Sequence, residues 1–167
     1  MVRFRFRFGR NVPEDVREEM RGYLLNPKLG WPALGYDLVE VPDASRKCDV
    51  VIRLQPSAKM DELYGDIPRL RGMSVTDSGA RPMRIDLHET NWFTPPTAFL
   101  HNPELRQMSR AQQYHCYVCN HEMGHALGYE HSRAVPGQAC PIMYQQTKGT
   151  GTRQTCVANP WPAVRAE

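Results

Sequence analysis

One run in the C-terminal half of the chain, HCYVCNHEMGHALGYEHS at residues 115–132, restricts the fold more than any other. It lies in a stretch that contains no proline, and no glycine before Gly124. Ser109 and Gln112, three residues apart, form a capping-box pattern at the start of this stretch. Gly128 is the residue type that commonly follows a helix end. The sequence therefore predicts one long helix from about Ser109 to near Gly128, against which the other elements must pack.

Two histidines and the two cysteines of this run fall on opposite sides of the predicted helix. At about 100° per residue, His121 and His125 share one face, whereas Cys116 and Cys119 lie on the other together with Met123. One zinc ion with bonds of about 2.0–2.3 Å cannot be reached from both sides of a helix. We therefore expect the cysteines to be buried core residues. A redox pair is disfavoured because such pairs lie at a helix N-terminus, and this one is in mid-helix.

The spacing HExxHxxGxxH assigns a role to each of its residues. His121 and His125 present two imidazoles to one ion, and Glu122 is angled away from the ligand position but reaches a water beside the metal. Gly128 permits a left-handed turn that returns His131 as a third ligand. Three histidines leave one position open, which is typical of catalytic zinc sites. We therefore expect one Zn²⁺ and a catalytic Glu122.

The rest of the chain carries both strand and helix patterns, which indicates an α+β fold. Strands are predicted at residues 2–8, 36–41, 48–54 and 82–89, and a first helix from Pro13 to Leu25 with Asn11 as its cap. Residues 55–80 show no clear period and are predicted to be loop, with one short strand near 72–75. Residues 132–167 are predicted to be irregular and to form one wall of a cleft.

The organisation of the chain favours one domain over residues 1–167, because no linker or repeat divides it. Within it we expect an upper subdomain at residues 1–128, with the sheet and the long helix. A lower subdomain at residues 129–167 would contain the third ligand.

Composition restricts the class of protein further. With 41% hydrophobic and 23% charged residues, the chain is typical of a soluble globular protein, and its net charge of +3 is mild. No apolar run is long enough to span a bilayer, and arginines interrupt the N-terminus where a secretory signal would be apolar. We expect a monomer without membrane association, cytoplasmic by default or secreted if this is a mature form.

The N-terminal alternation VRFRFRF predicts a strand with one dry face and one face of arginines. A solvated outer face of a sheet explains Arg3, Arg5 and Arg7. The alternative is a phosphate-binding ribbon, which would belong to a basic nucleic-acid-binding module with a structural zinc.

The zinc-site pattern, followed twelve residues later by Met143, resembles the signature of the metzincin clan of zinc metallopeptidases, in which a turn containing methionine follows HExxHxxGxxH. More narrowly, HEMGHALGYEHS with IMY is similar to the matrixin pattern. The segments YHCYVCNHEMGHALG, CP, QQTKG and NPWP are similar to an uncharacterised actinobacterial family of zincin-like proteins. This similarity is firm over roughly the last 60 residues.

The resemblance implies a zincin-like fold: a small twisted mixed sheet, a backing helix, a long active-site helix and an irregular C-terminal subdomain. It implies that His121, His125 and His131 bind zinc, that Glu122 is the general base, and that Met143 forms a hydrophobic floor beneath the metal. It also implies that the strand at 82–89 is the cleft edge, which aligns an extended peptide by strand addition.

Three further residues of the C-terminal segment are candidates for packing or for a cross-link. Tyr144 follows the methionine directly, one residue before the place of the switchable tyrosine ligand of some clan members, and is a candidate for packing in the cleft. Cys140 and Cys156 bracket the methionine turn. A disulfide between them would close a loop of about 15 residues in an oxidising compartment.

The function expected from these features is zinc-dependent hydrolysis of peptide bonds in a peptide or protein substrate, with Glu122 as the base. A zinc-dependent amidase acting on a small or cell-wall amide is the alternative, because the signature residues define the attack and not the substrate pocket. The nucleic-acid-binding module ranks below both.

Overall fold

A five-stranded sheet forms the base of the computed structural model, which describes residues 1–148 and 156–164. Its strands are β1 (Val2–Phe6), β2 (Leu38–Glu40), β3 (Val50–Gln55), β4 (Val75–Asp77) and β5 (Met83–His88). The order across the sheet is β2-β1-β3-β5-β4, and all neighbours are parallel except β4 and β5. The predicted mixed sheet is therefore confirmed.

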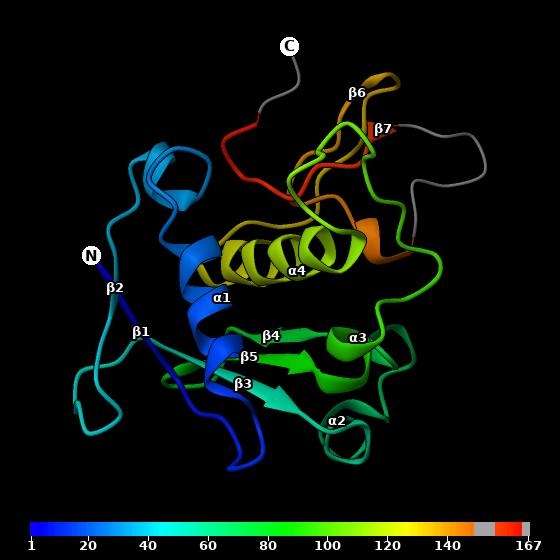
Figure 1. The fold of residues 1–167 in the computed structure, drawn as a ribbon. Coiled ribbons are helices and arrows are strands. Elements are labelled where there is room, and N and C mark those ends of the chain that lie inside the picture. The colour runs from blue at the N-terminus through cyan, green and yellow to red at the C-terminus, as the bar shows by residue number, and fades with distance from the viewer. Residues whose placement is uncertain (149–155, 165–167) are drawn as a thin grey trace.

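Helices lie on both faces of this sheet (Figure 1). The described residues contain the α-helices α1 (Glu14–Leu24), α2 (Ser57–Tyr64), α3 (Glu89–Phe93) and α4 (Arg110–Ala126), and the 3₁₀ turns η1 (Trp31–Leu34), η2 (Pro68–Leu70) and η3 (Gln146–Lys148). Helices α1 and α4 pack together on one face. Near the C-terminus, β6 (Gln138–Ala139) and β7 (Cys156–Val157) form a separate parallel pair. None of the described helices is both long and apolar enough to cross a lipid bilayer.

The main core lies between the sheet and the pair α1 and α4. Phe4 and Phe6 of β1 are buried there, which confirms the predicted dry face of the first strand. On the other face, Arg3 pairs with Asp49, and Arg5 donates to the main-chain oxygens of residues 43 and 45. Strand β1 lies inside the sheet, and these two arginines have partners within the chain.

The prediction of loop for residues 55–80 missed one helix and was otherwise largely confirmed. The chain forms α2 there, and the short strand predicted near 72–75 is β4 at 75–77. Helix α2 is held by tertiary contacts: Met60 and Tyr64 are buried, and the Tyr64 hydroxyl donates to the fully buried Asp86 of β5. The opposite face of the sheet therefore has a cover that the local pattern does not reveal. Helix α3 was not predicted either.

Two further predictions, the cap of the first helix and the edge strand, were wrong. Helix α1 begins at Glu14 with Pro13 at the N-cap and no side-chain cap, so Asn11 does not have the expected capping role. Strand β5, predicted at 82–89 to be the cleft edge, is an inner strand between β3 and β4. The edge is β4, because it alone pairs on one side only at this end of the sheet.

Candidate metal centre

Helix α4 carries the first two histidines and is fixed firmly along its length. The predicted capping box is present, with the Ser109 hydroxyl accepting from the Gln112 amide and the Gln112 side chain accepting from the Ser109 amide. Most of the helix from Gln113 to Gly124 is buried. The histidines are therefore built on a rigid element, which a metal site requires.

The end of α4 has the geometry predicted for it. Gly128 has φ of 99°, in the left-handed region, and its amide donates to the carbonyl of His125. The next amide, that of Tyr129, donates to the carbonyl of Gly124 at 2.9 Å. These two bonds form a Schellman motif, which ends the helix and turns the chain back towards it. His131 is brought to the other two histidines in this way.

The three predicted ligands lie together. His121, His125 and His131 could hold a metal ion, since each offers a ring nitrogen within 4.8 Å of the others. The Nε2 atoms of His125 and His131 are 3.2 Å apart. Two nitrogens bound to one tetrahedral zinc at about 2.0–2.1 Å would lie about 3.3–3.4 Å apart. The donor set and its spacing therefore fit such an ion.

Main-chain carbonyls orient two of the rings. The Nδ1 atom of His121 lies 2.8 Å from the Ile142 oxygen, and that of His125 lies 2.8 Å from the Tyr129 oxygen. Because a carbonyl only accepts, each Nδ1 carries the proton and each Nε2 is free to bind a metal. Burial also lowers the pKa of His121 to about 3, which keeps this ring neutral, as a ligand must be.

Met143 packs directly beneath the helix. It is buried, and a Cβ added at Gly124 would overlap its sulfur and lie 2.9 Å from Cζ2 of Trp31. The Met143 carbonyl accepts from the Ser132 amide at 3.0 Å, beside the third ligand. Met143 thus connects the helix with the loop that carries His131.

The histidines open into a cleft of about 490 Å³. Its walls come from the β4 region, from α4 and from the segment after Met143; that segment contributes Gln145 and Thr147, but Tyr144 is not among the lining residues. Residues 149–155 and 165–167, within the predicted lower subdomain, lie outside the described part of the chain. The cleft therefore has the sheet edge on one side and the irregular C-terminal part on the other.

Glu122 also lines the cleft and is almost fully enclosed. Burial raises the pKa of its carboxyl to about 8, and a hydrogen bond from Thr76 acts in the opposite direction. The Thr76 hydroxyl is 2.6 Å from Glu122 Oε2 and 2.9 Å from the Glu122 main-chain oxygen. Thr76 carries no sequence signal, because it is 46 residues away in a region without a readable period.

Cys116 and Cys119 are free and buried, as predicted. Burial raises the pKa of both thiols well above its usual value. They are therefore neutral thiols and not the thiolates that bind zinc. Neither belongs to the histidine cluster.

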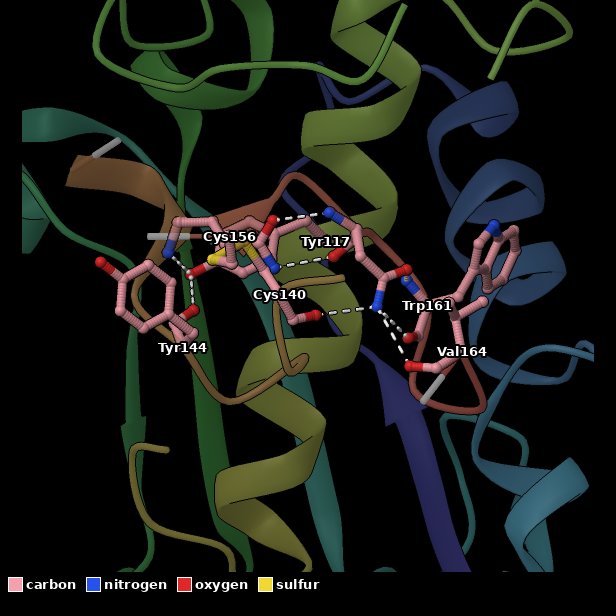
Figure 2. Close-up of a disulfide and its surroundings, with 8 residues drawn as sticks. Tyr117, Cys140, Tyr144, Cys156, Trp161 and Val164 are labelled. Atoms are coloured by element: carbon pink, nitrogen blue, oxygen red, sulfur yellow. Dashed lines mark hydrogen bonds between the residues drawn. A yellow bond between two sulfur atoms is a disulfide. The ribbon is translucent and has the colours of Figure 1, made fainter. Parts of the chain in front are cut away.

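Cys140 and Cys156 are joined by a disulfide, shown in Figure 2. Around it, the Asn159 side-chain amide donates to the Cys140 carbonyl at 2.9 Å, and Gln146 and Asn159 exchange two hydrogen bonds. The Tyr117 hydroxyl of α4 accepts from the Gln146 amide and donates to the Tyr144 carbonyl. The segment that contains Met143 is thus held both by the C-terminal part of the chain and by α4.

His115, to which the sequence assigned no role, joins three elements. Its ring stacks on Trp92 of α3 with centroids 3.8 Å apart, and its Nε2 lies 2.6 Å from the Trp92 carbonyl. Its Nδ1 lies 2.6 Å from the Glu19 carboxylate of α1. These partners give His115 a structural role away from the metal cluster.

A family model described as "Protein of unknown function (DUF3152)" matches residues 16–161, which is most of the chain. No curated protein and no solved structure gives a significant match.

Proposed function

The chain belongs to the DUF3152 family, whose function is unknown, and we propose that this member is a zinc-dependent endopeptidase of the metzincin type. One observation carries the proposal: the imidazoles of His121, His125 and His131 converge at the cleft, and the Nε2 atoms of the last two are 3.2 Å apart. Glu122 lies in the same cleft, directly after the first ligand. The resemblance of the sequence to the metzincin signature supports the same reading.

The residues of the chain would divide the chemistry between them. His121, His125 and His131 would hold zinc, which supplies a Lewis acid that polarises a carbonyl and makes water more acidic. Glu122 would take a proton from the attacking water and pass it to the leaving amine. Burial disfavours its ionised form, but a cation held by the adjacent histidines would favour that form and so keep the carboxylate available as a base.

The position of β4 supports a peptide as substrate. This strand is the sheet edge, it is antiparallel to β5, and Ser74, Val75 and Thr76 line the cleft. An edge strand has unpaired main-chain groups, which bind an extended peptide by strand addition. The role that the resemblance implied for residues 82–89 is therefore reassigned to β4.

Replacing the base tests the mechanism. Glu122→Ala should retain zinc, because all three histidines remain, and should lose peptide cleavage, because the carboxylate that follows the first ligand is removed. The exposed carboxyl of Glu104 lies outside the cleft, so Glu104→Ala is the control and should keep both properties. Cleavage by Glu122→Ala at the wild-type rate would rule out this base.

The substrate class needs a broad screen. Zinc-loaded protein incubated with a diverse peptide library should produce internal cuts, read by mass spectrometry. Complete absence of cuts in every peptide, with zinc bound, would contradict an endopeptidase and favour an amidase acting on a small or cell-wall amide.

A further inference from the structure

Thr76 lies where the edge strand β4 contacts α4. It is the middle residue of β4 and pairs in register with Ile85 of β5. Ile85 belongs to the main core on the α4 side, so the Thr76 side chain also faces α4. There its hydroxyl meets two oxygens of one residue, the main-chain oxygen and Oε2 of Glu122, at 2.9 and 2.6 Å.

Glu122 depends on this contact for its orientation. Its side chain is buried, and in the described part of the chain no second hydrogen bond reaches its carboxyl group. A carboxyl group has two equivalent oxygens and rotates about its last bond unless something holds it. A single hydroxyl therefore fixes the orientation of the carboxyl group, with Oε2 turned toward β4.

We propose that Thr76 is the positioning residue for Glu122: its hydroxyl holds Oε2 against β4 and thereby presents the other carboxyl oxygen, Oε1, to the metal cleft. This inference rests on the proposed function, in which Glu122 is the base. Thr76 itself gains and loses no proton. Its one hydrogen is donated to Oε2, the nearer of the two Glu122 oxygens, and can stay there when Oε1 takes a proton from water.

The location of Thr76 gives this contact a second consequence. The same three-residue strand would align the substrate backbone and orient the base. A peptide added to β4 is therefore placed in register with Glu122 without any intermediate element. This linkage predicts that losing the hydroxyl impairs turnover more than binding, because the main-chain edge remains.

Two variants test this prediction. Thr76→Val keeps the size and β-branched shape but removes the hydroxyl, and Thr76→Ser keeps the hydroxyl. Thr76→Val should lower kcat for a cleaved peptide by about tenfold to a hundredfold, as expected for losing a hydrogen bond to a charged group, with KM and zinc content nearly unchanged. Thr76→Ser should stay within about threefold of wild type. An unchanged kcat in Thr76→Val, or an equally slow Thr76→Ser, would overturn the inference.

A readout independent of activity separates this inference from the proposed function. In zinc-loaded protein labelled with carbon-13, the Glu122 carboxyl resonance should shift in Thr76→Val and remain in place in Thr76→Ser. The carboxyl of Glu19, which contacts His115, serves as the internal control. If Glu122 shows the same resonance in all three proteins, Thr76 does not position it. If wild type cleaves no peptide, the proposed function fails, while the resonance still decides the role of Thr76.

Discussion

For His121 and His125, the sequence predicts the role of one ring nitrogen and not the partner of the other. Their metal-facing sides follow from the i, i+4 spacing on a helix, which is local and readable. Their Nδ1 partners, the carbonyls of Ile142 and Tyr129, could not be predicted, because a main-chain oxygen has no residue signature. The contact of Thr76 with Glu122 could not be predicted for a related reason, because it depends on how the strands are ordered in the sheet.

Gly124 offers a prediction at this scale. Gly124→Ala should lower the free energy of unfolding by about 1–3 kcal/mol, because the new methyl group would overlap Met143 and crowd Trp31 in a packed core. Urea unfolding measures the change.

Gly22 provides the matched control for this substitution. It is also in a helix, but nothing lies within 4 Å of a Cβ placed there. Gly22→Ala should therefore be neutral or stabilise by up to about 1 kcal/mol through helix propensity. Equal effects of the two substitutions would show that Met143 does not pack against the helix as described.

The strands and the two long helices were predictable, and the short helices α2 and α3 were not. Helix α4, helix α1 and strand β1 each carry several residues of one period, which is why their positions agree with the sequence. Helix α2 has eight residues and depends on burial of Met60 and Tyr64, so its stability comes from tertiary contacts that no local pattern contains. The N-cap of α1 is Pro13 and not Asn11, and its φ of −61° is the value that the proline ring imposes.

The disulfide offers a prediction for the element that contains Met143. Replacing Cys140 and Cys156 together by serine should lower the free energy of unfolding by up to about 3 kcal/mol. The disulfide joins residues 16 positions apart, and without it the unfolded chain gains conformational freedom. Chemical unfolding of the variant and of wild type without reductant gives the difference. Unchanged stability would mean that the hydrogen bonds of Asn159 and Gln146 alone hold this segment.

At the scale of the whole molecule, the order of strands is what the sequence could not supply. The α+β class and the mixed sheet were predicted correctly. The strand predicted to be the edge is β5, whereas the edge in the structure is β4. Strand order depends on crossovers between distant segments and not on the pattern of any one strand. The positions of the three histidines could be predicted because a helix and one glycine turn determine them locally.

A bound metal would also stabilise the whole molecule. Because zinc would bind three groups that only the folded chain brings together, adding it should raise the melting temperature of protein treated with a chelator, in a concentration-dependent manner. Wild-type protein should show this rise and His131→Ala should show much less. A rise of the same size in both proteins would place the zinc elsewhere.

The zinc content of wild type and of His131→Ala, measured by elemental analysis after extensive dialysis, tests the central claim most directly. We predict about one zinc ion per wild-type chain, as expected for a site with three histidine ligands, and a large loss in the variant, because two histidines on one helix bind the ion far more weakly. His131 lies on the loop beyond the helix, so its loss should leave the fold of α4 intact. Near-equal zinc content in the two proteins, or none in wild type, would contradict the account.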